Sequence, residues 1–85
     1  MKDRVVVVTG AAGTIGREVS RVLVANGARL ALTDVSAGPL ETLMEELEGT
    51  AGTVWGRAGD AADFGEFSRL VADATEVLGL SLIHI

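Results

Sequence analysis

The sequence predicts an α/β fold in which helices cover both faces of a parallel sheet, a doubly wound arrangement. Short apolar or β-branched runs alternate with amphipathic segments of helical length, and this strand–helix order occurs three times. Strands and helices that alternate in this way form parallel sheets through crossover connections. Because such crossovers are right-handed, we expect the first two helices on one face and the strand order 3-2-1.

The first expected unit is a strand over residues 4–9 and a helix over residues 15–26. The run RVVVVT is short and β-branched, which is typical of a strand buried on both faces. Asn26-Gly27 predicts the helix end, because glycine readily adopts the left-handed conformation. The helical period predicts an inward apolar face made of Ile15, Val19, Val22 and Leu23.

The second unit is a strand over 29–33 and a helix over 39–48. Pro39 suits the first turn of that helix, where a missing N–H costs nothing. An apolar stripe and an acidic face share the helix. We expect the stripe, Leu40, Leu43, Met44 and Leu47, to be buried, and the acidic residues, Glu41, Glu45, Glu46 and Glu48, to face water.

The third unit is a weaker strand over 53–57, with Trp55 expected to pack in the core, and a helix that ends near Leu78. Asp63, with Glu66 three residues later, predicts an N-cap with a capping-box partner. The inward face of this helix is expected to carry Phe67, Leu70, Val71, Ala74 and either Val77 or Leu78.

Composition narrows the possible functions. Eighty-five residues make at most one small domain, and 48% hydrophobic with 22% charged residues is too apolar for a disordered chain. The net charge of −5 argues against nucleic acid and anionic membranes as partners, and no apolar run approaches the roughly 18 residues of a membrane span. The absence of cysteine excludes thiol catalysis and thiolate metal sites. We therefore expect a cytoplasmic domain with no metal, nucleic-acid or membrane site.

A glycine-rich loop, TGAAGTIG at residues 9–16, joins the first strand to the first helix. In this context Gly10 permits a sharp exit from the strand, Gly13 permits close backbone approach to an anion, and Gly16 permits close helix packing. The free N–H groups and the positive dipole end of the helix then favour a phosphate. The alternative is a tight turn without a ligand.

Two acidic residues accompany the loop. Asp34 ends the second strand, where a carboxylate would accept hydrogen bonds from both ribose hydroxyls and repel a 2′-phosphate. Asp60 follows the third strand and would reach an adenine edge in the same geometry. The alternatives are a turn or N-cap residue for Asp34 and a loop residue that caps the last helix for Asp60.

The stretches VVVVTGAAGTIG, ALTDV and GDAAD resemble the N-terminal half of the short-chain dehydrogenase/reductase family, over residues 3–79. The loop spacing is similar to the T-G-x-x-G-x-x-G of the extended branch, which includes epimerases, whereas residues 29–49 resemble the main branch. The resemblance implies a partial Rossmann-like domain that binds NAD(H), with NADP(H) a weaker ligand. It implies a small-molecule carbonyl or alcohol substrate and a homo-oligomeric parent protein.

The same resemblance assigns binding roles to individual residues. It implies contacts to adenine from Asp60 and Ala61 and selection of NAD(H) by Asp34. The implied diphosphate site consists of Gly10, Ala12, Gly13, Thr14, Ile15 and Gly16. No catalytic residue can be transferred, because the family uses a tyrosine–lysine pair, whereas this chain has no tyrosine and its only lysine is Lys2. The alternatives are an extended-branch epimerase or dehydratase, a non-catalytic dinucleotide-binding protein, and a methyltransferase-like fold.

The last six residues, LSLIHI at 80–85, carry a separate expectation. The codons CTG-TCT-CTT-ATA-CAC-ATC would encode them and resemble a transposase mosaic-end adaptor from sequencing libraries. We therefore expect residues 1–79 to be the N-terminal half of a dinucleotide-binding domain and residues 80–85 to be translated adaptor. The alternative is a genuine fourth strand, because leucines and isoleucines alternate loosely with Ser81 and His84. Even a non-native tail could pair with the first strand, since any apolar strand fits an open sheet edge. We also expect the first strand and last helix of such a fragment to expose apolar surface.

Overall fold

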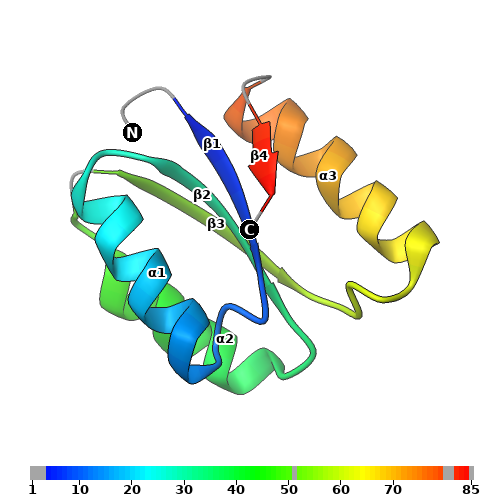
Figure 1. Ribbon diagram of the computed structural model, residues 1–85, viewed down its shortest axis with the longest axis horizontal. Helices are drawn as coiled ribbons and strands as arrows, with labels where there is room; N and C mark the ends of the chain where they lie inside the picture. Colours follow the sequence, from blue (N-terminus) through cyan, green and yellow to red (C-terminus); the bar gives the residue numbers. More distant parts are fainter. Residues whose placement is uncertain (1–3, 51, 80–81, 85) are drawn as a thin grey trace.

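The computed structural model describes residues 4–50, 52–79 and 82–84, the last three as backbone only. Strands and helices alternate along the chain (Figure 1). The strands are β1 (Val5–Thr9), β2 (Arg29–Asp34), β3 (Thr53–Ala58) and β4 (Leu82–His84). The helices are α1 (Thr14–Ala25), α2 (Ala37–Leu47) and α3 (Phe64–Leu78).

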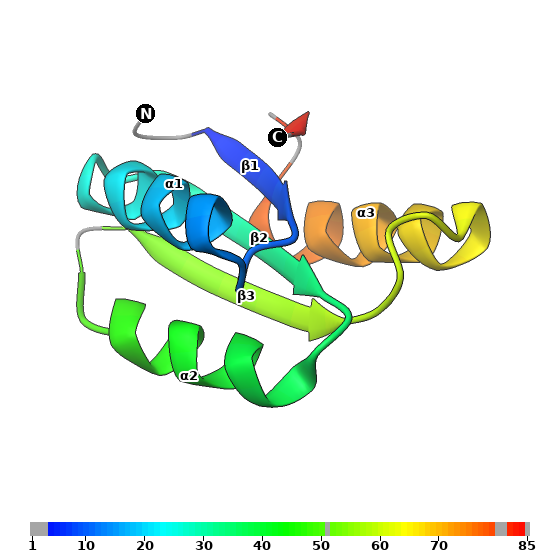
Figure 2. The ribbon, with the colours of Figure 1, turned by 60° about the horizontal axis from the view of Figure 1, so that its bottom comes forward.

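All strands of the sheet are parallel, in the order β3-β2-β1-β4, which confirms the predicted order 3-2-1. Figure 2 shows this order from β3 up to β1. In the register, Thr9 pairs with Thr33, and Asp34 pairs with Ala58. The pairing of β4 with β1 is expected of any short apolar strand at an open edge, so it agrees with both interpretations of residues 80–85. The side chain of His84 lies outside the described residues.

Two apolar cores lie on opposite faces of the sheet, because successive strand residues point to opposite sides. Val6 and Val8 belong to the core under α1 and α2, whereas Val5 and Val7 belong to the core under α3. Figure 1 shows α1 and α2 on one side of the sheet and α3 on the other, as expected for a doubly wound sheet. The expectation that the first strand exposes apolar surface was wrong: Val5 to Val8 are at most 2% exposed, since helices cover both of their faces and β4 covers the edge. The same expectation for the last helix is confirmed, since Phe64 of α3 is 84% exposed.

The predicted inward face of α1 was right for Leu23, which packs against the core under α1 and α2, but wrong for two other residues. Ile15 is 80% exposed and Val22 is 59% exposed, whereas Ser20 and Val24 are buried. The buried positions follow Gly16 at intervals of four residues, which places them on the same side of the helix. Gly16 packs directly against the loop below it, and this contact decides which face of α1 turns inward.

For the other two helices, the observed burial agrees better with the burial predicted from the sequence. In α2 the three leucines are buried and Met44 is half-buried against the same core, while its three glutamates and the C-cap residue Glu48 are exposed. The helix begins at Ala37 rather than at the predicted Pro39. The proline nevertheless lies in the first turn, as predicted. In α3, Leu78 rather than Val77 is buried, and Phe64 at its start is exposed. Trp55 is half-buried against the core under α3, consistent with its expected packing role.

Candidate functional site

Two of the three glycines in the loop between β1 and α1, Gly10 and Gly16, have the geometry that the sequence predicts. Gly10 has a φ of +62°, which L side chains rarely adopt, and its carbonyl accepts a 3.0 Å hydrogen bond from the N–H of Gly13. A Cβ on Gly16 would lie 2.2 Å from that same carbonyl oxygen and 2.9 Å from Cα of Ala11. Gly10 therefore reverses the chain and Gly16 lets α1 start directly against the loop.

The start of α1 offers backbone donors. The N-cap is Gly13, no side chain caps the helix there, and its first turn contains no acidic residue. The N–H groups of Thr14, Ile15 and Gly16 have no carbonyl to bind within the helix. They border an open hollow of about 390 Å³, lined by Val8, Thr9, Gly10, Gly13, Thr14, Ile15, Gly16 and Val19. Such a helix start suits an anion such as a phosphate.

Asp34 lies against this loop, and the structure brings the two together as predicted. Its Oδ2 accepts a 3.0 Å hydrogen bond from the N–H of Ala12, and its Oδ1 accepts a 3.2 Å bond from the N–H of Ser36. The side chain thus also stabilises the turn before α2, as the turn alternative proposed. An ionised carboxylate has about four acceptor positions, so acceptor capacity remains for further donors.

Asp60 and Ala61 border a second hollow, on the α3 side of the sheet. It measures about 310 Å³ and is lined by Thr33, Arg57, Ala58, Gly59, Asp60, Ala61, Glu66, Phe67, Arg69 and Leu70. None of these residues lines the hollow at the glycine loop. The candidate binding residues therefore do not share one cavity: most of the glycine loop lines the first hollow, Asp60 and Ala61 line the second, and Ala12 and Asp34 line neither.

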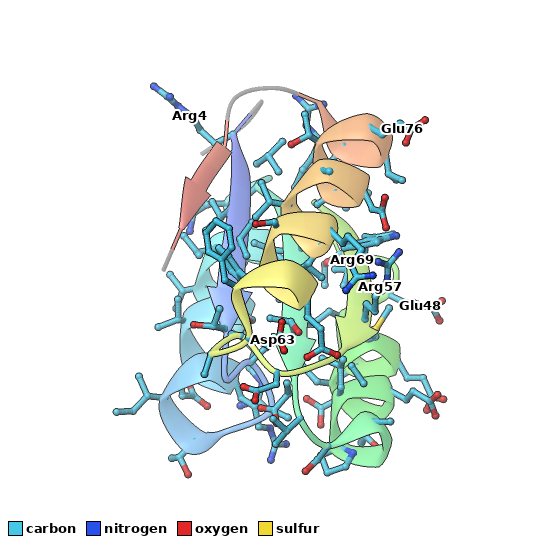
Figure 3. All side chains as sticks on the ribbon, turned by 90° about the vertical axis from the view of Figure 1, so that its right-hand side faces the viewer. Arg4, Glu48, Arg57, Asp63, Arg69 and Glu76 are labelled. Carbon is cyan, nitrogen blue, oxygen red and sulfur yellow. The ribbon has the colours of Figure 1, made fainter. Side chains whose placement is uncertain are left out.

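The loop around Asp60 is held by its own hydrogen bonds. Asp60 Oδ1 accepts a 2.9 Å bond from the N–H of Ala62, and Asp63 Oδ1 accepts a 2.9 Å bond from the N–H of Glu66, which confirms Asp63 as the N-cap of α3. The expected capping box differs in one respect: the Glu66 carboxylate accepts from the N–H of Asp60, at 3.2 Å. The N–H of Asp63 donates to the carbonyl of Asp60 instead, at 3.0 Å. Figure 3 shows Asp63 at the start of α3.

Two arginines that the sequence analysis did not single out also line this second hollow. Figure 3 shows Arg57 and Arg69 close together beside α3. Arg57 is paired with Asp73 at 2.5 Å and lies 5.2 Å from the centre of the Trp55 ring. Arg57 stands two residues after Trp55 on a strand, which places it on the same face of the sheet and was the available signal.

A charged cluster links α1 to α2. Glu46 pairs with Arg17 at 3.2 Å and with Arg21 at 2.9 Å, and Arg21 also pairs with Glu18. The hydrogen bond from Arg21, reinforced by the charges of both arginines, lowers the pKa of Glu46 below its ordinary value. The side chain of Arg17 therefore forms an ion pair with Glu46 of α2.

Other kinds of site are not found among the described residues. In that part of the chain no three histidine, cysteine, aspartate or glutamate side chains gather where they could hold a metal ion. A search of the same residues finds no helix whose length and apolarity would allow it to cross a membrane.

Comparisons with known proteins agree with this geometry. The family model for the short chain dehydrogenase matches residues 4–82. The L-rhamnose 1-dehydrogenase (NAD(P)(+)) of Azotobacter vinelandii is 36% identical over 81 residues, which are 91% of this chain and 32% of that protein.

Solved structures agree as well. A short-chain type dehydrogenase/reductase from Mycobacterium ulcerans has a TM-score of 0.89 at 28% identity, covering 99% of this chain and 32% of its own. A short chain dehydrogenase/reductase from Burkholderia phymatum in complex with NAD has a TM-score of 0.83 at 28% identity. The match covers 91% of this chain and 27% of that structure's chain.

The chain spans about a third of the length of the relatives that it matches. The matched residues run from before β1 into β4, so they include the glycine loop, Asp34 and Asp60. Sequence, strand order and loop geometry lead to the same assignment: the chain belongs to the short chain dehydrogenase family.

Proposed function

We propose that this chain supplies the adenosine-diphosphate part of a nicotinamide dinucleotide site, with NAD(H) preferred over NADP(H). The parent protein would be an oxidoreductase that moves hydride to or from a carbonyl or alcohol carbon of a small molecule. The observation that carries the proposal is the 3.0 Å contact between the Asp34 carboxylate and the Ala12 N–H, because it puts a ribose acceptor directly beside the glycine loop.

The individual roles follow from the chemistry of the two hollows and of the Asp34 carboxylate, which contacts the glycine loop without lining either hollow. The amides at the start of α1 would bind the diphosphate, the Asp34 carboxylate would accept the ribose hydroxyls, and Asp60 with Ala61 would contact adenine. The diphosphate group comprises Gly10, Ala12, Gly13, Thr14, Ile15 and Gly16. When bound, the nicotinamide ring supplies the hydride chemistry, and this chain's residues bind and orient the other end of the cofactor.

The preference for NAD(H) rests on charge. A carboxylate at the ribose position repels a 2′-phosphate, and the nearest basic residue on α1, Arg17, is paired with Glu46. The relatives support a nicotinamide dinucleotide in general, since one is a dehydrogenase named for NAD(P)(+) and another binds NAD. The family match supports an oxidoreductase over the epimerase, non-catalytic and methyltransferase-like alternatives.

We also propose a cytoplasmic, homo-oligomeric parent without nucleic-acid or membrane partners. The net charge of −5 supports the lack of nucleic-acid and membrane partners, the absence of cysteine supports the location, and the homo-oligomeric state rests on the family resemblance alone.

Ligand titrations of the 85-residue chain followed by ¹⁵N–¹H NMR test the cofactor proposal. NADH should shift the amide signals of Gly13 to Gly16, and NADPH should bind at least about tenfold more weakly, since it brings a phosphate dianion against Asp34. S-adenosylmethionine, the ligand of the methyltransferase alternative, should shift none of them. NADH shifts confined to other segments, or equal affinity for NADH and NADPH, would contradict the proposal.

A further inference from the structure

Asp34 connects three segments of the candidate site. Its carboxylate accepts the N–H groups of Ala12 and Ser36, and its main-chain carbonyl accepts a 3.0 Å hydrogen bond from the N–H of Gly59. These donors belong to the glycine loop, the turn before α2 and the connection from β3 to α3. Each connection leaves the same end of the sheet, at the bottom of Figure 1.

The contact with Ala12 continues the pairing of β1 with β2 beyond the end of β1. The regular register ends at Thr9 and Thr33, after which the chain reverses at Gly10. The N–H of Ala11 then donates to the carbonyl of Thr33 at 3.0 Å, and the next N–H, that of Ala12, donates to the Asp34 side chain. The carboxylate is thus the last acceptor that fixes the loop to β2 before α1 begins.

We propose that Asp34 is a positioning residue for the diphosphate, in addition to its proposed role at the ribose. By holding Ala12, its carboxylate keeps the loop and the first turn of α1 in the anion-binding conformation before any ligand arrives. One acceptor position on each oxygen is used by Ala12 and Ser36, so the remaining positions can serve the ribose hydroxyls at the same time. This inference rests on the proposed function and adds a role to the same site.

The proposal makes a prediction that opposes simple electrostatics. Removing the Asp34 charge should by itself favour a nearby diphosphate, because a like charge disappears. Loss of the positioning contact acts in the other direction, since ligand binding must then order a loop that was previously held. A net loss of diphosphate affinity in a variant without the carboxylate is therefore the signature of positioning.

The first test uses the ligand-free chain and amide hydrogen exchange. Asp34→Ala should accelerate exchange at Ala12 roughly tenfold or more, because the N–H loses a charged acceptor. Asp34→Asn, which keeps one acceptor oxygen, should lie between Asp34→Ala and the unmodified chain. Asp60→Asn is the matched control, since it removes the same charge from the same edge of the sheet, and its carboxylate contacts Ala62 rather than the glycine loop.

Exchange at Val7 and Leu30, which are fully buried in β1 and β2, separates local from global effects. Unchanged exchange at these two residues shows that a variant is folded. Acceleration confined to the glycine loop then supports the proposal, whereas unchanged exchange at Ala12 in folded Asp34→Ala overturns it. If Asp34→Ala does not fold, Asp34→Asn provides the same comparison.

The second test separates positioning from ribose binding. ADP and 2′,3′-dideoxyadenosine 5′-diphosphate carry the same diphosphate, but only ADP has hydroxyls for Asp34 to accept. Asp34→Ala should weaken binding of both ligands by about threefold or more. Glu45→Gln is the control for binding, because Glu45 is exposed on α2 and lines neither hollow, and it should leave both affinities unchanged. If Asp34→Ala weakens only ADP, Asp34 acts on the ribose alone and the inference is wrong. Failure of the unmodified chain to bind ADP would instead contradict the proposed function, and the exchange result would still decide the contact.

Discussion

The carbonyl oxygen of Gly10 lies only 2.2 Å from the position that a Cβ on Gly16 would occupy. Gly10 begins the turn from β1 into α1, and Gly16 lies in the first turn of α1. Because the obstructing atom belongs to the backbone, no side-chain rotation can relieve the contact. The approach of α1 to the sheet therefore depends on the absence of a side chain at residue 16.

Gly16→Ala should accordingly be the most damaging single methyl addition to the loop. We expect destabilisation of about 3 kcal/mol, the upper part of the usual range for overpacking, or failure to fold. Urea unfolding monitored by circular dichroism measures the effect. Gly38→Ala is the control, because a Cβ there meets nothing within 4 Å, and in helix α2 alanine should stabilise by about 0.5–1 kcal/mol. Equal stability of the Gly16 and Gly38 variants would contradict the packing argument.

Gly10 makes a different demand, on backbone conformation rather than space. Its φ is +62°, but a Cβ would meet nothing within 4 Å. Gly10→Ala should therefore cost only the left-handed conformation, about 1–2 kcal/mol, and Gly10→Asn should cost less because asparagine tolerates that conformation. Free energies of unfolding from urea titrations give the comparison. An asparagine variant as unstable as the alanine variant would show that space, not φ, limits this position.

The cluster of Glu46, Arg17 and Arg21 should make stability depend on acid pH. Arg21 lowers the pKa of Glu46 in the folded state, so the folded protein binds that proton less readily than the unfolded chain. The stabilisation is complete above the unfolded pKa of about 4.3 and is lost as pH falls through the lower folded value. The stability difference between the unmodified chain and Glu46→Gln should thus shrink between about pH 5 and pH 3.

Urea unfolding at pH 7, 5 and 3 tests this dependence, with and without added salt. The effect should be small and should weaken with salt, since the pairs are partly exposed. Glu45→Gln is the control, because Glu45 is an exposed glutamate of α2 with no ion pair among the described residues. A difference for Glu46→Gln that persists unchanged at pH 3 would exclude the ionised carboxylate as its cause.

The N-cap of α3 can be tested independently of the glycine loop. Asp63→Ala removes the acceptor of the Glu66 N–H and should destabilise the protein by about 1 kcal/mol. Asp63→Ser keeps a capping oxygen and should retain most of the stability. Thermal unfolding measures both variants. If serine and alanine are equally destabilising, the carboxylate contributes through charge at the helix start rather than through the cap.

The sequence predicted most of the fold because its signals are local. The valine run, the leucine stripe of α2 and the Asp63 cap each depend on residues within a few positions of one another. The order 3-2-1 followed from the handedness of crossovers, which does not depend on the particular side chains. The positions of the glycine loop and Asp34 followed in turn, since the carboxyl ends of neighbouring parallel strands meet at one edge.

Predictions that needed long-range packing succeeded less often. The apolar period of α1 suggested that Ile15 and Val22 face inward, but both are exposed. The spacing of Asp63 and Glu66 suggested a reciprocal cap, yet the Glu66 carboxylate binds the N–H of Asp60. Sequence spacing could not reveal this, because the Asp60 loop folds back over the start of α3.

The sequence by itself determined the kind of elements, their order in the sheet and the edge at which the candidate binding residues collect. Those features follow from hydrophobic periodicity, capping chemistry and chain handedness. Only the tertiary structure decided the rotation of α1, the division of the site into two hollows and the contact of Asp34 with Ala12. The contact of Asp34 with Ala12 joins segments 22 residues apart, and the rotation of α1 depends on the close fit of Gly16 against the backbone of Gly10, so neither can be read from local periodicity.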